Sequence, residues 1–269
     1  MKQNVSVCIP VYNGEDTIEA AIQSVLNQSY ENLEIIVVDN ASTDSTLQKI
    51  QRFDDNRIKV FVNESNLGMA GNWNKCLEYV TSEFVHFLCA DDVMERDCIE
   101  KKVKAIQEPN TVMVYSSSEL IDDKDEVLMK RVQYKSDRRF DGMKLAKKSF
   151  LSRNLYGEPS NVLFKAEVIR QVGGFSLDTC YVTDWEFWLR VSTLGDVAYL
   201  KDILVKYRVS NGNTTSKLTN KKMLMDDKVM VKKIEEDGFL KVSFLEKKIH
   251  HLMYFLRMYA RNIYMRIKC

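Results

Sequence analysis

Several features are scarce or missing in this sequence, and each absence excludes a class of protein. Prolines number only three and charged residues make up 29%, which argues against extensive disorder. No apolar run reaches 18 residues, so we expect no membrane-spanning helix. The amino terminus leads directly into a strand-like segment, without the long apolar stretch and cleavage site of a signal peptide.

The cysteines and histidines offer little metal or redox chemistry. The six cysteines lie far apart and lack C-x-x-C spacing, which argues against a disulfide framework or a zinc site and favours a reducing compartment. His86 lies within an apolar, strand-like segment and fits a core residue. His250 and His251 are adjacent, and adjacent side chains of a helix point about 100° apart, so we expect them not to share one metal ion.

Three common motifs of nucleotide-binding proteins and hydrolases are also missing. The sequence contains no G-x-G-x-x-G fingerprint, no P-loop G-x-x-x-x-G-K-[ST] and no G-x-S-x-G nucleophile elbow.

What is present is a chain of 269 residues with 45% hydrophobic residues, enough to build the core of one or two domains. The net charge of +1 is unevenly spread, because 13 basic and 6 acidic residues lie between Lys217 and Cys269. An acidic body therefore carries a basic tail.

Alternating strand-like and helix-like segments predict an α/β protein. Continuous apolar runs, which are typical of strands buried on both faces, occur at residues 5–11, 33–38, 58–62, 84–90 and 111–115. Helical spacing of apolar residues connects these runs, so we expect a doubly wound, mostly parallel sheet. Residues 116–154 are polar and irregular and predict loops and short strands. Farther on, we expect a helix at 182–192, one or two strands at 197–209, and a helical extension from residue 220.

Polar side chains follow three of the predicted strands, at the point where each strand ends. These are the segments Pro10–Asn13, Asp39–Ser42 and Asp91–Asp92. Ligands of open parallel sheets bind beyond the carboxyl ends of the strands, so the three segments together predict a crevice. Two adjacent carboxylates could hold a hard divalent cation on phosphate oxygens, although one could also cap the following helix. Asp39 could accept the N3–H of a uracil ring or form a turn with Ser42.

Two further segments could contribute to such a site. Residues 66–74 contain Gly68 and Gly71, which would allow the backbone to approach a ligand closely, although a turn and a helix cap would also need them. Asp184 lies beside two tryptophans, and partial desolvation there would raise its pKa toward that of a general base. Glu186 and Arg190 are one helical turn apart and fit a structural ion pair.

Taken in order, these segments resemble family-2 glycosyltransferases of the GT-A fold over about the first 210 residues. The matching segments are I-P-V-Y-N at 9–13, V-V-D-N-A-S-T-D at 37–44, N-L-G-M-A-G-N at 66–72, F-L-C-A-D-D at 87–92, G-G-F at 173–175, T-D-W-E-F-W-L-R at 183–190 and Y-R at 207–208. The resemblance implies a GT-A-like sheet with a C-terminal helical extension. It divides the chain into a catalytic domain at 1–215, with a nucleotide-binding half at 1–115 and an acceptor half at 116–215, and a basic helical tail at 216–269.

The resemblance also implies roles for single residues. Asp184 would be the catalytic base, and Asp92 would bind Mn²⁺ or Mg²⁺. The residues implied to contact the nucleotide-sugar are Pro10, Tyr12, Asn13, Asp39, Asn66, Gly71 and Asp91. The sequence departs from the family pattern at Cys89, where many members place the first aspartate of D-x-D, and near Ser210, where some carry a metal-binding histidine. Metal binding would therefore depend on Asp91 and Asp92.

The implied activity is that of an inverting hexosyltransferase. It would move a sugar from a UDP-hexose or UDP-N-acetylhexosamine to an acceptor hydroxyl, on a lipid-linked glycan of surface polysaccharide synthesis. An alternative is an inactive nucleotide-sugar-binding subunit of an assembly. A nucleotidyltransferase would need a basic glycine-rich loop, whereas residues 13–16 are acidic. We expect no nucleic-acid partner.

The predicted C-terminal helix carries one apolar stripe flanked by basic residues. The stripe consists of Leu245, Ile249, Leu252, Leu256, Tyr259, Ile263 and Ile267. It could pack on the catalytic domain or on a second subunit of a homo-oligomer, or it could rest on an anionic membrane surface. We therefore expect a cytoplasmic protein that the tail could bring to the inner face of the plasma membrane.

Overall fold

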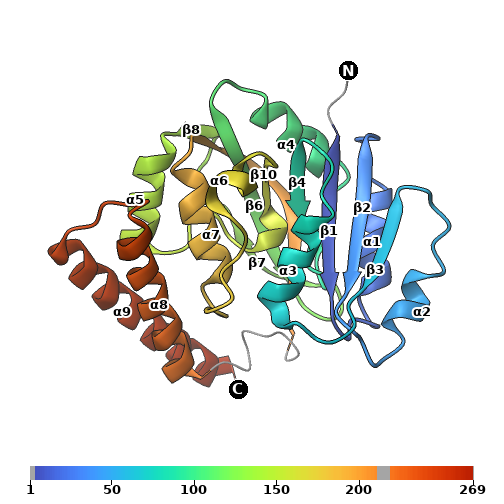
Figure 1. Ribbon diagram of the computed structural model, residues 1–269. Helices are drawn as coiled ribbons and strands as arrows, with labels where there is room; N and C mark the ends of the chain where they lie inside the picture. Colours follow the sequence, from blue (N-terminus) through green and yellow to red (C-terminus); the bar gives the residue numbers. More distant parts are fainter. Residues whose placement is uncertain (1–3, 211–218, 269) are drawn as a thin grey trace.

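The computed structural model describes residues 4–210 and 219–268 (Figure 1). The predicted boundary between residues 215 and 216 lies outside the described residues. The strands are β1 (Val5–Val11), β2 (Leu33–Asp39), β3 (Ile58–Val62), β4 (Phe84–Phe87), β5 (Val93–Met94), β6 (Thr111–Ile121), β7 (Val127–Arg131), β8 (Arg138–Phe140), β9 (Val162–Lys165) and β10 (Asp196–Arg208). The helices are α1 (Ile18–Leu26), α2 (Thr46–Ile50), α3 (Gly68–Glu78), α4 (Cys98–Ile106), α5 (Gly142–Ser152), the 3₁₀ turn η1 (Pro159–Asn161), α6 (Val168–Val172), α7 (Thr183–Ser192), α8 (Asn220–Asp237) and α9 (Phe244–Lys268).

The strands form one mixed sheet in the order β3-β2-β1-β4-β9-β6-β10-β5, and β7 and β8 pair with β6 and β10. Strands β1 to β4 run parallel to one another, and β6 pairs in parallel with β10. Strand β9 is antiparallel to both of its neighbours, β4 and β6, so β4, β6 and β10 share one direction. The predicted doubly wound, mostly parallel sheet is confirmed.

The apolar runs follow from burial on both faces of the sheet. All seven residues of β1 are buried, and their side chains alternate between the two faces. Val5, Val7 and Ile9 pack in a cluster with α1 and α4, whereas Cys8 packs in a second cluster with α3 and α7. A strand that contacts apolar helices on each face cannot alternate apolar with polar residues.

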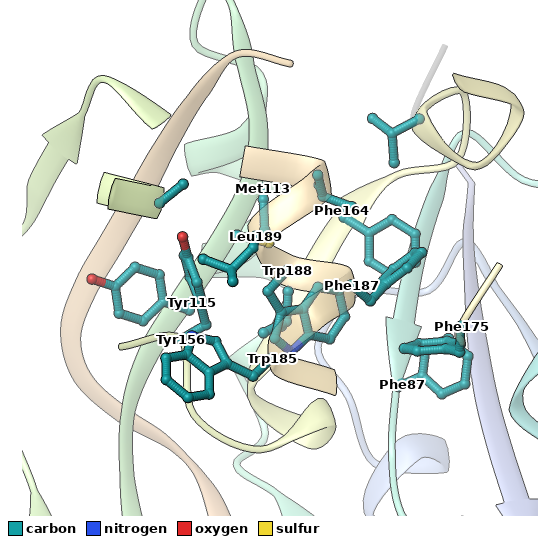
Figure 2. Packing of buried hydrophobic residues seen from close by; sticks show 14 of the residues in the cluster. Phe87, Met113, Tyr115, Tyr156, Phe164, Phe175, Trp185, Phe187, Trp188 and Leu189 are labelled. Atoms are coloured by element: carbon teal, nitrogen blue, oxygen red, sulfur yellow. The ribbon is translucent and has the colours of Figure 1, made fainter. Parts of the chain in front are cut away.

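Aromatic side chains dominate the core on the α7 face of the sheet (Figure 2). Phe164 of β9 is fully buried and contacts Phe87, Phe187 and Trp188, with ring centroids 5.6 to 6.5 Å apart. These contacts join β4, β9 and α7 and thereby fix the position of α7 on the sheet.

Helix α5 was not expected, because residues 116–154 predicted only loops and short strands. The short strands β7 and β8 are present, but residues 142–152 form a helix. Leu145, Ala146 and Phe150 are buried on one face, and the carboxylate of Asp141 caps the helix by accepting the Lys144 amide. A Cβ on Gly142 would lie about 2 Å from backbone oxygens of residues 192 and 195, so only glycine allows the helix to start there.

The tail helices pack against the body next to α5 (Figure 1). His250 and Tyr254 form the buried face of α9. The described side chains of the predicted apolar stripe, between Leu245 and Tyr259, in contrast face away, and Leu245 and Leu252 are 66% and 59% exposed. The side chains of Ile263 and Ile267 lie outside the described ones. None of the described helices is long and apolar enough to cross a bilayer.

Two smaller predictions are confirmed. The described cysteines, at positions 8, 76, 89, 98 and 180, are all free thiols. His86 is fully buried in β4, and burial together with the nearby charge of Lys102 keeps its pKa well below the usual value.

We expect Phe164→Ala to lower the free energy of unfolding by about 3 to 5 kcal/mol, because it leaves a cavity among the aromatic rings. Urea denaturation followed by far-UV circular dichroism would measure the change. The control is Leu177→Ala, whose side chain is 71% exposed, and which should change stability by less than about 0.5 kcal/mol. Equal stability of the two variants would contradict the assigned core.

Candidate active site

The carboxyl ends of β1, β2 and β4 lie side by side, as the sequence predicts. Val11 pairs with Asp39 at the ends of β1 and β2. Beyond β4, the amide of Leu88 donates a hydrogen bond of 2.9 Å to the carbonyl of Cys8 in β1. The segment Leu88–Asp92, which we call the acidic loop, therefore leaves the sheet next to β1.

The loops that follow β1 and β2 are tied together by side-chain hydrogen bonds. Asp39 is 1% exposed, and its carboxylate accepts the hydroxyl and the amide of Ser42, the latter at 3.1 Å. The Asn13 amide donates to Oγ of Ser42 at 2.9 Å, and Oδ1 of Asn13 accepts the Thr43 amide at 2.8 Å. Asn13 and Ala41 both have positive φ angles, of 50° and 59°, which bend the two loops toward each other. Asp39 thus forms the turn with Ser42 that the sequence suggested.

A network of asparagines joins these loops to the start of α3. Oδ1 of Asn40 accepts the Asn63 side-chain amide at 2.9 Å, and its Nδ2 donates to Oδ1 of Asn66 at 2.9 Å. Buried Asn72 donates to the carbonyl of Val38 at 3.0 Å. The sequence analysis did not identify Asn40, Asn63 or Asn72, although each lies in or beside a segment that it selected.

The other predicted nucleotide-sugar contacts differ in exposure. Pro10 is buried inside β1, whereas Tyr12 just beyond it is 48% exposed. Asn66 is exposed at the entrance to α3. A Cβ on Gly71 would lie 2.8 Å from Cβ of Leu67, so packing within the helix entrance already requires glycine at this position.

The acidic loop is fixed by the carboxylate of Asp92. Asp92 is fully buried, and one of its oxygens accepts the Ser160 hydroxyl while the other accepts the Arg208 amide at 2.9 Å. Ser160 also accepts the Cys89 amide at 2.9 Å, and the Arg208 side chain donates to the carbonyl of Asp91 at 3.1 Å. The side chain of Asp91 itself is only half-buried. Asp92 therefore holds the loop, and Asp91 is its more accessible carboxylate.

The negative charge of this loop is incompletely compensated. Burial raises the pKa of Asp92 well above its usual value, and the neighbouring charge of Asp91 raises it further. Burial also raises the pKa of Asp91. The ligand atoms of Cys89, Asp91 and Asp92 lie within 4.8 Å of one another. Carboxylate oxygens suit Mg²⁺ or Mn²⁺, and a divalent cation would relieve the repulsion, so the donor set fits such an ion.

Cys89 does not replace the carboxylate that the family pattern would place there. Burial, and then the charges of Asp92 and Asp91, raise the pKa of its thiol well above the usual value. A neutral thiol is a poor ligand for a hard cation. The two aspartates are therefore the groups of the loop whose chemistry fits a hard cation.

Asp184 occupies the first turn of α7, where its surroundings raise its pKa to about 7. Burial is the main cause, and the negative charge of Glu158 adds to it. Hydrogen bonds oppose the shift, including one of 3.3 Å from Nδ2 of Asn154 to Oδ2 of Asp184. The adjacent Trp185 is 5% exposed and Trp188 is fully buried. The predicted rise in pKa is confirmed.

Asp184 and the acidic loop form one electrostatic cluster. The charge of Asp184 contributes to the raised pKa of Cys89, and the charge of Glu158 raises the pKa of both Asp92 and Asp184. Oε2 of Glu158 is buried and has no hydrogen-bond partner among the described residues. Acidic groups from the loop after β4, from the residue before η1 and from the first turn of α7 are far apart in the sequence and thus converge at one place.

The Glu186–Arg190 pair is structural, as predicted. Nε of Arg190 donates to Oε1 of Glu186 at 2.7 Å, and Nη2 donates to Oε2 at 2.7 Å. The side chains are 0% and 6% exposed, and Arg190 also donates to the carbonyl of Gly174 at 2.8 Å. This pair holds the G-G-F turn against α7.

Sequence reasoning missed the residues that organise the acidic cluster. These are Asn154, Glu158, Ser160 and the side chain of Arg208. The one indication of these residues in the sequence is Pro159, because proline is common at the first position of a helical turn.

A hollow of about 450 Å³, lined by Glu19, Ala20, Gln23, Arg52 and Phe53, involves none of the acidic-loop residues. It holds no cluster of polar groups comparable with the acidic cluster.

Comparison with protein families gives one match that covers most of the chain. A model described as glycosyl transferase family 2 matches residues 6–173. An uncharacterized glycosyltransferase of Haemophilus influenzae is 34% identical over 223 residues, which cover 80% of this chain and 68% of that protein.

Two further similarities concern a named enzyme and a solved structure. The Escherichia coli UDP-Glc:alpha-D-GlcNAc-diphosphoundecaprenol beta-1,3-glucosyltransferase WfgD is 39% identical over 117 residues, or 44% of this chain and 46% of that enzyme. This chain therefore spans less than half of WfgD in the match. The mannosyltransferase PcManGT of Pyrobaculum calidifontis, solved with GDP-Man and Mn²⁺, superposes with a TM-score of 0.66 at 20% identity, covering 94% of this chain and 70% of that chain. The likeness shows a shared GT-A fold.

Proposed function

The chain belongs to glycosyl transferase family 2, and we propose that it transfers a hexose or N-acetylhexosamine from a nucleotide-sugar to an acceptor hydroxyl, with inversion at the anomeric carbon. One observation carries this proposal. A carboxyl group with a pKa of about 7, that of Asp184, belongs to the same acidic cluster as the two aspartates of the acidic loop. Such a pKa suits a base that works near neutral pH.

We propose that the donor is a UDP-sugar bound at the ends of β1 and β2. Tyr12 offers an exposed aromatic ring. Both oxygens of the buried Asp39 carboxylate accept hydrogen bonds from Ser42, and each oxygen has a second lone pair, one of which would accept the uracil N3–H. Asn13, Asn66 and the backbone near Gly71 would add contacts to the donor, and buried Pro10 would shape the end of β1. WfgD uses UDP-Glc by name, whereas PcManGT was solved with GDP-Man, so the choice of base rests on Asp39.

We propose that Asp91 and Asp92 hold one Mn²⁺ or Mg²⁺ ion. The sequence pattern favours Asp92 as the direct ligand, but both of its oxygens already accept hydrogen bonds within the protein. The half-buried Asp91 is therefore the better direct ligand, and Asp92 would keep the loop in place. When bound, the ion would neutralise negative charge on the diphosphate leaving group.

The chain's own residues would carry the proton in a single displacement. The unprotonated carboxylate of Asp184 would accept the proton of the acceptor hydroxyl while the oxygen forms a bond to the anomeric carbon. The bond from that carbon to the diphosphate oxygen would break on the opposite face, which inverts the configuration. Asn154, which donates to Oδ2 of Asp184, would hold the carboxylate in position for the hydroxyl.

We propose that the acceptor is a lipid-linked glycan of surface polysaccharide synthesis and that α9 rests on the anionic inner face of the plasma membrane. WfgD is named for a diphosphoundecaprenol-linked substrate. On α9, an exposed apolar face lies among basic residues such as Lys247 and Lys248. Its exposed members are Phe244, Leu245, Ile249, Leu252, Met253, Phe255, Leu256 and Tyr259.

We expect Asp184→Asn to lower transfer by about 10² to 10⁴-fold, because the amide cannot accept the proton. For the unmodified protein, kcat/KM should rise about tenfold per pH unit up to pH 7 and then level off, since only the unprotonated carboxylate acts. The variant should lack this rise. Transfer of a radiolabelled sugar would measure the rates, and titration calorimetry with UDP would measure nucleotide binding. Retained UDP binding with no transfer in either protein would favour the inactive-subunit alternative.

The two loop aspartates should respond differently to amide substitution. Asp91→Asn should raise the Mn²⁺ concentration needed for half-maximal transfer at least tenfold, with little change in melting temperature. Asp92→Asn should mainly lower the melting temperature, since it replaces a buried acceptor of two hydrogen bonds, and added Mn²⁺ should not restore its activity. Metal titrations of transfer and thermal unfolding distinguish the roles. Rescue of Asp92→Asn by Mn²⁺ would instead make Asp92 the direct ligand.

We expect a variant with Leu245, Leu252 and Leu256 changed to serine to bind anionic vesicles more than about tenfold less, because each leucine contributes roughly 1.5 to 3 kcal/mol when buried. Flotation with phosphatidylglycerol-containing vesicles would measure this binding. The matched control changes Leu128 and Met129 of β7, which are also exposed, to serine. If the unmodified protein, the variant and the control float equally, α9 does not bind the membrane.

A further inference from the structure

A second cluster of metal-ligating side chains lies in the tail and shares no residue with the acidic cluster. It consists of Asp227 of α8 and the adjacent His250 and His251 of α9. Nε2 of His250 lies 2.6 Å from Oδ1 of Asp227, and Nδ1 of His251 lies 3.0 Å from Oδ2. The two rings were expected to diverge, but both turn toward the carboxylate of the opposite helix.

The orientation of His250 is fixed from its other side. Its Nδ1 lies 2.7 Å from the carbonyl oxygen of Phe150 in α5, and the ring stacks on that of Phe150 with centroids 4.1 Å apart. A carbonyl can only accept, so Nδ1 carries a proton and Nε2 is the nitrogen directed at Asp227. Histidines that bind metals are oriented in the same way, by a hydrogen bond from the second nitrogen to a backbone carbonyl.

Burial makes this cluster different from a surface ion pair. His250 and Asp227 are 0% and 1% exposed, whereas the His251 side chain is 45% exposed. The neighbouring Asp226 is also buried, and its Oδ2 is occupied by the amides of Cys180 and Tyr181, at 2.9 and 2.7 Å. Buried carboxylates are costly unless a cation or several donors compensate them. The cluster therefore combines two buried side chains with one that reaches solvent.

We propose that Asp227, His250 and His251 bind a Zn²⁺ ion or a similar transition-metal ion. Two imidazole nitrogens and one carboxylate oxygen suit Zn²⁺, whereas Mg²⁺ and Mn²⁺ prefer oxygen ligands. Their ligand atoms lie within 4.8 Å of one another, and about 3.4 Å separates the ligands of a tetrahedral Zn²⁺ site, so small side-chain movements would suffice. A proton held between Nε2 of His250 and Asp227 would pass to solvent on binding.

Such an ion would tie the tail to the part of the body that carries Asp184. It would link α8 to α9 directly and, through the Phe150 carbonyl, to α5. The His250 ring also lies 5.9 Å from that of Trp185, the residue after Asp184. The site would therefore stabilise the docking of both tail helices, whatever reaction the acidic cluster performs.

The experiment uses the full-length, tag-free Asp91→Asn protein, from which a chelator has removed bound metal. The substitution ensures that the acidic loop contributes little to the measured Zn²⁺ binding. Competition with a chromophoric chelator should give one Zn²⁺ bound with a micromolar or lower Kd, and Co²⁺ should give the visible absorption of a low-coordinate site. Adding His251→Ala should weaken Zn²⁺ binding at least tenfold and reduce the rise in melting temperature at a given Zn²⁺ concentration.

Two matched variants keep this test specific. Leu252→Ala removes an exposed neighbour of His251, and Cys180→Ser removes the nearby thiol, so neither should change the Zn²⁺ affinity. His251 is partly exposed, so its alanine variant should fold, which circular dichroism would verify. A Kd weaker than about 100 μM, an affinity unchanged by His251→Ala, or an affinity lost with Cys180→Ser would each overturn the proposal.

Discussion

The buried carboxylate of Asp92 is the constraint on which the acidic site depends. It accepts hydrogen bonds from Ser160 and from the Arg208 amide, which lie 68 and 116 residues away in the sequence. A buried carboxylate without these donors would be costly, so the loop, η1 and the end of β10 must come together as a unit. The position of the neighbouring Asp91 follows from that assembly, since Arg208 also holds its carbonyl.

The same burial that stabilises the core also sets the chemistry of Asp184. The aromatic cluster fixes α7 on the sheet, and the first turn of that helix places Asp184 beside Asn154 and within the field of Glu158. Desolvation and a like charge both disfavour the ionised form, so the pKa reaches about 7. Packing and reactivity are therefore not separate properties of this helix.

The sequence predicted much of the fold, and the exceptions have physical causes. Strands buried on both faces must be continuously apolar, so the apolar runs in the sequence correctly predicted β1 and β2. Helix α5 was missed because two of its five buried positions are Gly142 and Ser149, which carry no apolar signal, and because its start depends on the absence of a side chain at Gly142. The ring orientations of His250 and His251 were predicted wrongly because a helical wheel ignores how side-chain torsions respond to a partner such as Asp227.

By itself, the sequence determined the buried strands and the helices that connect them, the family, and the acidic residues at the strand ends, because these depend on local periodicity and on short contiguous motifs. Only the tertiary structure decided which of the two loop aspartates is enclosed, that Glu158 and Ser160 join the cluster, and which face of α9 is left exposed. Hydrogen bonds, desolvation and charge act through space between residues as far apart in the sequence as Asp92 and Arg208, and no local pattern in the sequence records those distances.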